Sequence, residues 1–273
     1  MTAQLDVGAA TGLTLDRPAG PIAALSAGED DAPVVLLVPG FTGSKEDFGP
    51  VLDPIAAAGW RAVAIDLPGQ YESPGRGDFS VDALGADVRD IAASLGDGVH
   101  LLGHSFGGFV ARAAVIAEPG RFASLTLMDS GPSGIDGGRR ARIDALRPVL
   151  VAHGMAAVYD AMTALAIAEP GYVAPPPAVE AFLRRRFLAS DPAGMLAMGN
   201  GVIDEPDRVD KLAATAVRTL VLAGADDDVF PVTVQEGMAK RLGAAYVEVP
   251  GAAHSPAVDN PSITAAALIR FWS

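Results

Sequence analysis

The chain has 273 residues, of which 50% are hydrophobic, enough for one large α/β domain, or for a domain with an insertion, to bury its own core. It has no cysteine, which excludes disulfides, thiolate chemistry and cysteine-based metal sites, and its net charge of −13 disfavours nucleic acids and anionic membranes as partners. The N-terminal residues lack the basic and apolar segments of a signal peptide, so we expect a soluble, cytoplasmic protein.

Short apolar runs alternate with Ala-rich helical stretches along most of the chain. This pattern is typical of a mostly parallel sheet with helices on both faces. The expected strands, about eight, are residues 13–16, 22–26, 34–38, 61–66, 99–102, 124–128, 219–223 and 245–249. The expected helices of the core are residues 51–58, 81–95, 106–118, 232–242 and 262–271.

The strongest functional signal is Gly103-His104-Ser105-Phe106-Gly107, where an apolar run gives way to a helical one. A serine in a sharp turn between strand and helix needs very small residues two positions before and after it, because the backbone folds back there. Its hydroxyl would also lie at a helix N-terminus, where free N–H groups favour developing negative charge. The alternative is an ordinary glycine-rich turn with a capping serine.

The alternation stops between Gly131 and about Ala214, where helical periodicity continues without a convincing strand. We expect a core domain of residues 1–130 and 215–273 and an inserted helical cap of residues 131–214. Residues 149–168 are apolar but interrupted by polar residues, which favours a helix of a soluble protein over a membrane span.

Large apolar side chains are candidates for a substrate pocket, although at helical spacing they more often serve packing. The candidates are Tyr71, which precedes the cap, and Met155, Tyr159, Met162, Phe182 and Phe187 within it. At least two of the arginines at positions 184–186 are expected to face solvent.

A serine nucleophile needs a general base, and the chain has four histidines. His254 follows the last expected strand, at the edge where open α/β sheets gather their site residues. His100 lies inside an expected strand, His104 is the neighbour of Ser105 in the chain and cannot easily turn back to it, and His153 belongs to the expected cap. His254 is therefore the predicted base.

The imidazole needs a carboxylate that fixes its tautomer and stabilises its charged form. Asp226, Asp227 and Asp228 follow the strand at residues 219–223. Like charges this close raise one another's pKa, so one should point inward and the others into water. Asp129, after the preceding strand, is the alternative. The cluster lacks the spaced ligands of a divalent-cation loop, so no metal is expected.

The order serine, aspartate, histidine differs from that of the common serine proteases, and here the chain resembles the α/β-hydrolase fold superfamily. The resemblance covers about residues 34–271. The superfamily's Gly-x-Ser-x-Gly elbow is matched by residues 103–107, and its closing Gly-x-x-His by Gly251 and His254. Its acid loop is matched by Gly224, Asp227 and Pro231, which selects Asp227. Its oxyanion loop is similar to residues 39–44, with Pro39 in place of the usual histidine, and Gln70-Tyr71 replaces a usual His-Gly pair.

The resemblance implies a serine hydrolase that cleaves a small, largely apolar carboxylic ester through an acyl-enzyme on Ser105. The backbone N–H groups of Phe41 and Phe106 would form the oxyanion hole, and no cofactor is implied. The same residues could serve a carbon–carbon bond hydrolase, a lactonase, a thioesterase, a perhydrolase or an acyltransferase, or belong to a non-catalytic ligand receptor. The serine argues against the dehalogenase and epoxide hydrolase branches, which attack with an aspartate. The expected partner is a small-molecule substrate, and the oligomeric state is not indicated.

Overall fold

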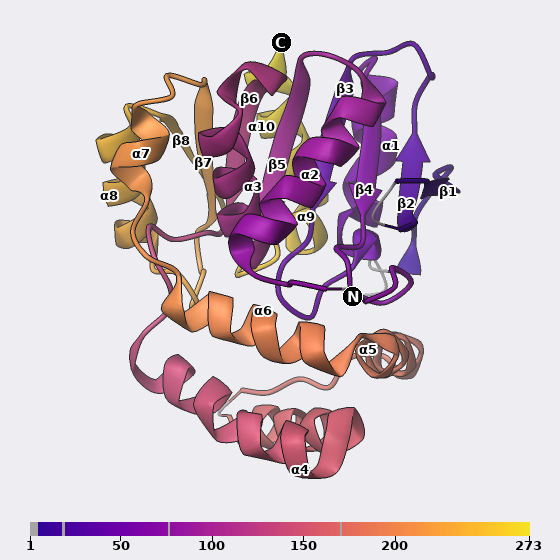
Figure 1. Cartoon of the computed structure of the whole chain (residues 1–273), viewed down its shortest axis with the longest axis vertical. Helices are drawn as coiled ribbons and strands as arrows, with labels where there is room; N and C mark the ends of the chain where they lie inside the picture. Colours follow the sequence, from indigo (N-terminus) through magenta and orange to yellow (C-terminus); the bar gives the residue numbers. More distant parts are fainter. Residues whose placement is uncertain (1–4, 18–19, 76, 170) are drawn as a thin grey trace.

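The computed structural model describes residues 5–17, 20–75, 77–169 and 171–273, and its centre is an eight-stranded sheet (Figure 1). The strands are β1 (Thr11–Leu15), β2 (Ile22–Ala27), β3 (Val34–Val38), β4 (Arg61–Ile65), β5 (Val99–His104), β6 (Phe122–Met128), β7 (Thr219–Gly224) and β8 (Ala245–Val249), in the spatial order β1-β2-β4-β3-β5-β6-β7-β8. Strand β2 pairs antiparallel with β1 and β4, and the remaining neighbours are parallel. The predicted fold class is confirmed.

Helices cover both faces of the sheet because successive side chains of each strand point to opposite sides. In β3, Leu36 packs into one core and Leu37 into the other. The first core includes α2 (Val81–Leu95), α3 (Phe106–Ala117) and α8 (Val232–Leu242), and the second includes α1 (Gly49–Ala57), α9 (Pro256–Asp259) and α10 (Pro261–Trp272). Two 3₁₀ helices, η2 (Lys45–Phe48) and η3 (Pro119–Arg121), precede α1 and β6.

Strand β5 runs further than the sequence indicates, and its end positions the candidate site. Glycine is a poor strand former, so the expected strand stops before Gly103. In the structure, Gly103 pairs with Leu127 and His104 with Met128, which continues the parallel ladder. Helix α3 begins directly after Ser105. The serine therefore lies at the carboxyl end of a central strand, where such sheets bind their ligands.

Helices α4 (Gly137–Ile167), α5 (Pro177–Ala189) and α6 (Pro192–Asp204) form a layer below the carboxyl edge of the sheet in Figure 1, and we call them the helical layer. In the described residues between β6 and β7, the chain forms helices and no strand. Helix α7 (Val209–Ala213) packs against α3 and α8 instead of the layer. Helix α7 falls within the residues 131–214 that were expected to form the cap, but it packs on helices that cover the sheet.

Helix α4 is long and apolar enough, by length and composition, to cross a membrane: it has 31 residues, and its most apolar window has a mean hydropathy of 1.4 with 11% of it buried. However, Gly154 has non-helical angles of φ 76° and ψ −175°, which divide α4 at a kink. Each half is shorter than the ~20 residues that a span needs. The apolar side of α4 instead faces a cavity over the sheet, through residues such as Leu146 and Leu150.

Candidate active site

The backbone around Ser105 makes a sharp turn that only small residues allow. Ser105 itself has φ 53°, in the left-handed region that side chains rarely adopt. A Cβ on Gly103 would lie 2.2 Å from the carbonyl oxygen of Gly107, and a Cβ on Gly107 would lie 2.4 Å from that of Pro39. Both contacts are far inside van der Waals distance, so the two glycines are required for the chain to turn. Such strain at a non-glycine residue is found at functional sites.

Three side chains from distant parts of the sequence form one hydrogen-bonded line. The hydroxyl Oγ of Ser105 lies 2.9 Å from Nε2 of His254, and Nδ1 of His254 lies 2.9 Å from Oδ1 of Asp227. Ser105 follows β5, Asp227 follows β7 and His254 follows β8, so the parallel sheet brings their carboxyl ends together. The geometry is that of a serine whose proton has an acceptor and of an imidazole held by a carboxylate.

Asp227 is held by four donors. Its Oδ1 accepts from His254 and from the backbone N–H groups of Val229 (2.8 Å) and Phe230 (3.3 Å), and its Oδ2 accepts from Nε2 of Gln235 (2.8 Å). Burial alone would raise the pKa of Asp227, but the hydrogen bond and charge of His254, with the two backbone donors, hold it below its ordinary value. Asp227 is therefore an ionised carboxylate. Gln235, which was not predicted from the sequence, is fully buried beside Asp227.

Asp129, the alternative acid, lies in the same site without a hydrogen bond to His254 among the described residues. It is fully buried, and its Oδ1 accepts from the backbone N–H of Gly224 at 2.7 Å and faces Nε2 of Gln235 at 3.5 Å. Burial and the charge of Asp227 raise the pKa of Asp129 to about 9. The raised pKa favours the neutral acid at Asp129 and the lowered pKa favours the carboxylate at Asp227, which is the acid that contacts His254.

His104 supports the loop that carries His254. Its Nε2 donates to the carbonyl oxygen of His254 at 2.6 Å, and burial lowers the pKa of His104 to about 4, so the ring stays neutral. Ligand atoms of His104, Asp129 and His254 lie within 4.8 Å of one another, a spacing that could hold a metal ion. Both ring nitrogens of His254 are already engaged by Ser105 and Asp227, which leaves it no free ligand atom.

The loop expected to bind an oxyanion lies beside Ser105. Phe41, Thr42 and Phe106 line the same cavity as the serine. The buried side chain of Gln70 fixes this loop: its Nε2 donates to the carbonyl of Gly40 at 2.8 Å, and its Oε1 accepts from the N–H of Leu67 at 3.1 Å. Gln70, which stands where the superfamily usually has the histidine of a His-Gly pair, therefore holds the backbone of this loop in place.

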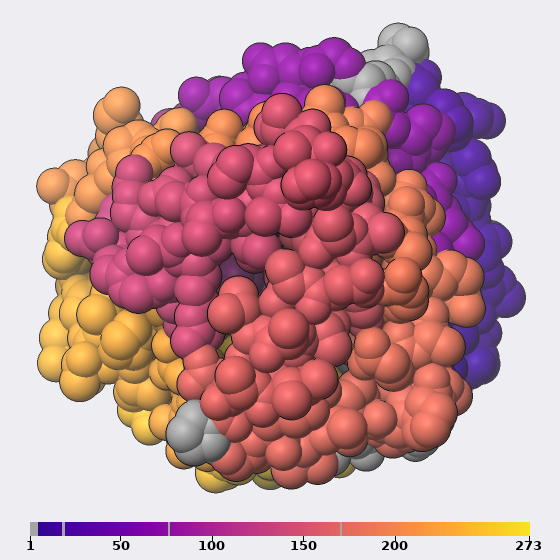
Figure 2. All heavy atoms as spheres, turned by 90° about the horizontal axis from the view of Figure 1, so that it is seen from below, coloured from indigo at the N-terminus to yellow at the C-terminus, as the bar shows by residue number. Residues whose placement is uncertain are grey.

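The cavity over Ser105 has a volume of about 320 Å³ and is partly covered by the helical layer. Its apolar lining includes Phe106, Phe109, Ile143, Leu146, Leu150, Val158, Met162, Leu165, Phe187, Met195 and Val202. Figure 2, which views the layer from below, shows an opening between the earlier and later parts of the α4 colour range. A substrate of moderate size could reach the serine while most of its surface is shielded from water.

Two of the six predicted pocket residues, Met162 and Phe187, line this cavity, and four do not. Because α4 changes direction at Gly154, the stripe that faces the cavity is Val158, Met162 and Leu165. Met155 and Tyr159 belong to the neighbouring stripe and pack inside the layer, where the hydroxyl of Tyr159 donates to Glu180 at 2.9 Å.

The other two corrections are Tyr71 and Phe182, whose rings pack edge to face, 5.9 Å apart, outside the cavity lining. The adjacent Arg186 is buried and forms an ion pair with Asp47 at 2.5 Å, which ties α5 to η2. Arg185 is exposed and Arg184 is half-buried in an ion pair with Asp160, so the run divides between solvent and a fixed internal contact.

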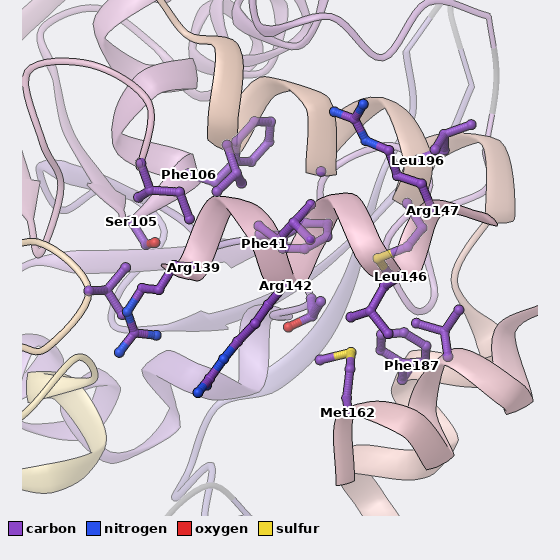
Figure 3. Close-up of a pocket in the computed structure, with 18 of the residues that line it drawn as sticks. Phe41, Ser105, Phe106, Arg139, Arg142, Leu146, Arg147, Met162, Phe187 and Leu196 are labelled. Carbon is purple, nitrogen blue, oxygen red and sulfur yellow. The ribbon is translucent and has the colours of Figure 1, made fainter. Parts of the chain in front are cut away.

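Three arginines of α4 that were not predicted from the sequence also line the cavity, namely Arg139, Arg142 and Arg147. Figure 3 shows Arg139 and Arg142 extending from α4 on the side of Ser105, and Arg147 near Leu196 at the far end. The signal was a helical stripe: Arg139, Arg142, Leu146 and Leu150 recur at intervals of three and four residues. Such a stripe identifies a face, but not what that face covers.

Comparison with known proteins gives consistent results. A family model described as the alpha/beta hydrolase family matches residues 35–267. A protein of Variovorax paradoxus (strain S110) named as a carbamate hydrolase, RutD, is 27% identical over 248 residues, which cover 89% of this chain and 93% of that protein. The 2-hydroxy-6-oxononadienedioate/2-hydroxy-6-oxononatrienedioate hydrolase of Escherichia coli (strain K12) is 35% identical over 119 residues, 40% of this chain and 39% of that protein.

Solved structures show the same fold. A structure from a study of carboxylesterases of Nitrososphaera gargenis superposes with a TM-score of 0.80 at 19% identity, covering 95% of this chain and 97% of that one. A thermophilic esterase from Thermogutta terrifontis superposes with a TM-score of 0.76 at 24% identity, covering 97% and 98%. At these identities the likeness concerns the arrangement of the chain alone.

Proposed function

The chain belongs to the alpha/beta hydrolase family, and we propose that it is a serine hydrolase that cleaves a small, largely apolar carboxylic ester. We further propose that the helical layer is its cap domain. The observation that carries the proposal is the hydrogen-bonded line from Ser105 through His254 to Asp227, with the serine facing a mostly apolar cavity under the helical layer. A serine that merely capped a helix would need neither partner, and the side chain of Ser105 makes no capping hydrogen bond to α3.

The proposed reaction begins with attack by Oγ of Ser105 on the ester carbonyl carbon while Nε2 of His254 takes the hydroxyl proton. The charge of the resulting imidazolium is stabilised by ionised Asp227, which also holds Nδ1–H in place. The carbonyl oxygen becomes an oxyanion, for which the proposed donors are the backbone N–H groups of Phe41 and Phe106, two residues that line the cavity beside Ser105.

Collapse of this intermediate breaks the bond to the alcohol, which leaves with the proton from His254 and leaves the acyl group on Ser105. Water then attacks the acyl carbon, giving its proton to His254, and the second collapse releases the carboxylic acid and restores the serine hydroxyl. Neutral Asp129 takes no proton in this scheme. Its role is to accept from Gly224 and to share Gln235 with Asp227.

A second candidate is carbamate hydrolysis. It is supported by the relative named as a carbamate hydrolase, which this chain matches over nearly its whole length. The chemistry would use the same serine attack and, on a carbamate ester, the same alcohol leaving group, so that a carbamoyl group in place of an acyl group would stay on Ser105 until water releases it. Parallel rates on a butyrate ester and on a carbamate of the same phenol would separate the two.

The test of the proposal is covalent labelling with a fluorophosphonate followed by peptide mapping. We expect one adduct on Ser105, hydrolysis of 4-nitrophenyl butyrate by the unmodified protein, and a loss of about 10³-fold or more in kcat in Ser105→Ala. The matched control is Ser130→Ala, because Ser130 is a buried serine at the end of β6 whose hydroxyl has no hydrogen-bond partner in the described structure.

Ser130→Ala should keep both labelling and turnover. Labelling of Ser105→Ala at the wild-type rate would contradict the assignment of the nucleophile. A single adduct on Ser105 without turnover of any ester or carbamate would instead favour a ligand receptor.

A further inference from the structure

The charged side chains that line the cavity over Ser105 are all of one sign. Apart from His254, they are Arg139, Arg142 and Arg147, and no carboxylate of the described residues lines this cavity. This contrasts with the whole chain, whose net charge is −13. The helical layer thus presents positive charge to the serine within an otherwise acidic protein.

The carboxylates that pair with two of these arginines lie on the side of a second cavity. That cavity, of about 920 Å³, shares Arg139 and Arg142 with the first and is also lined by Asp228 and Glu169. Arg139 uses Nε and Nη2 to bind Asp228, and Arg142 uses Nη2 to bind Glu169. Ion pairs this exposed are weak, so they leave the two guanidinium groups available to a ligand in the cavity.

Each of the two guanidinium groups retains unused donors. Among the described residues, Nη1 of Arg139 and both Nε and Nη1 of Arg142 donate no hydrogen bond. A guanidinium is always charged at physiological pH, and its planar set of donors matches the two oxygens of a carboxylate. Because Asp228 and Glu169 remain nearby, a singly charged group fits better than a phosphate dianion.

Arg139 and Arg142 lie apart from a group of apolar side chains in the cavity, and Arg147 lies near Leu196 at the far end. Figure 3 shows Arg139 and Arg142 on the Ser105 side, while Leu146, Met162 and Phe187 gather at the other end. A ligand with its scissile carbonyl at the serine can therefore place a charged portion near the two arginines and an apolar portion against the apolar side chains.

We infer that the substrate carries a carboxylate that Arg139 and Arg142 bind, together with an apolar portion that lies against Leu146, Met162 and Phe187. This rests on the proposed function, since it takes the cavity over Ser105 as the substrate site. The carboxylate can belong to either side of the scissile bond, to the acyl group or to the leaving alcohol, and the shared chemistry is the pairing of one carboxylate with two guanidinium groups.

The kinetic test compares two acidic esters, each with its neutral methyl ester as the matched substrate. Mono-4-nitrophenyl glutarate carries the carboxylate on the acyl side, and 4-(butyryloxy)benzoate carries it on the leaving group. We expect kcat/KM for at least one acid to exceed that of its methyl ester about tenfold or more. Arg142→Gln should reduce this ratio by about 10- to 100-fold, the effect of losing a charge-assisted hydrogen bond, and Arg142→Lys should restore part of it.

A binding test needs no turnover. In the Ser105→Ala background, titration calorimetry should show 4-phenylbutyrate binding about tenfold more tightly than 4-phenylbutanamide, and Arg142→Gln should remove the difference. The control is Arg184→Gln, which removes another arginine of the helical layer that is paired with an aspartate but lies outside the cavity lining. It should change neither the kinetic ratio nor the binding ratio.

The outcomes separate this inference from the proposed function. If neutral esters are hydrolysed through Ser105 but neither acid is preferred and the two phenyl ligands bind equally, the carboxylate site is refuted and the serine hydrolase stands. If no ester is hydrolysed but 4-phenylbutyrate binds in an Arg142-dependent way, the hydrolase proposal falls and the carboxylate site stands. Equal losses with Arg142→Gln and Arg184→Gln would show a merely structural role for Arg142 and overturn the inference.

Discussion

Replacing Asp227 by asparagine tests which buried acid holds the imidazole, and the structure predicts how the amide would sit. Three N–H donors converge on Oδ1 of Asp227, from His254, Val229 and Phe230, while Gln235 alone donates to Oδ2. An amide oxygen at Oδ1 keeps three of these hydrogen bonds, and an NH₂ group there would lose all three. We therefore expect the oxygen to face His254, so that Nδ1 of the histidine keeps its proton.

The expected loss in Asp227→Asn is then mainly that of the negative charge, and its size can be estimated. For the 2.9 Å separation of His254 Nδ1 and Asp227 Oδ1, Coulomb's law with an effective dielectric constant of about 20 gives roughly 5 to 6 kcal/mol between imidazolium and carboxylate. A neutral hydrogen bond is about half as strong as a charge-assisted one, so some 3 kcal/mol is lost. This corresponds to a fall in kcat of about 10²- to 10³-fold. A reversed amide, which would force the wrong tautomer, should cost nearer 10⁴-fold.

The assay is steady-state hydrolysis of 4-nitrophenyl butyrate, with Asp129→Asn, Asp226→Asn and Asp228→Asn as matched variants. Because Asp129 is already neutral at pH 7, its conversion to asparagine removes no charge and should lower kcat by less than about tenfold. A larger loss in Asp129→Asn than in Asp227→Asn would refute the assignment. Such a result would move the acid from the end of β7 to the end of β6.

Two stability predictions complete the set. In the folded protein the pKa of Asp129 is raised to about 9, whereas in the unfolded chain it is near 3.8, so this group makes the free energy of unfolding fall as pH rises across that interval. In Asp129→Asn, urea denaturation at pH 6, 7.5 and 9 should show a smaller fall in the free energy of unfolding than in the wild type. An equal fall in both proteins would contradict the neutral state of Asp129. Gly103→Ala would bring a Cβ to within 2.2 Å of a backbone carbonyl of α3 and should prevent folding, as judged by soluble yield and circular dichroism. The control is Gly237→Ala, in an open helical position of α8, which should raise the free energy of unfolding by about 0.5 to 1 kcal/mol. Equal soluble yields of the two variants would show that the turn at Ser105 tolerates a side chain at position 103.

Much of the core could be predicted from the sequence because its rules are local. Strands buried on both faces appear as short apolar runs, and the elbow appears as two glycines around a serine, since backbone contact at 2.2 to 2.4 Å admits no other residue. The choice between Asp129 and Asp227 could not be made from residue types alone. They follow neighbouring strands β6 and β7, and the sheet brings both to Gln235, so only burial and hydrogen bonding separate the ionised acid from the neutral one.

The cavity lining resisted prediction because it depends on how a helix is rotated over the sheet. Gly154 changes the direction of the second half of α4. As a result, Met155 and Tyr159 pack within the helical layer, while Val158, Met162 and Leu165 face the cavity over Ser105. The arginines in the first half of α4 were not predicted to line the cavity, because a charged stripe on an amphipathic helix usually faces water.

The serine, histidine and aspartate and the lining of the cavity come from different parts of the molecule. The hydrogen-bonded line is built from loops after β5, β7 and β8, whose positions the buried sheet fixes, so changes elsewhere should leave the bond-breaking chemistry in place. The residues that we propose to sort substrates by charge and shape come largely from α4, which a loop joins to β6 and which is bent at a glycine. Substitutions in α4 can therefore alter the preferred substrate at little cost to the fold, and a change of substrate in this scaffold should arise from α4 before it arises from the sheet.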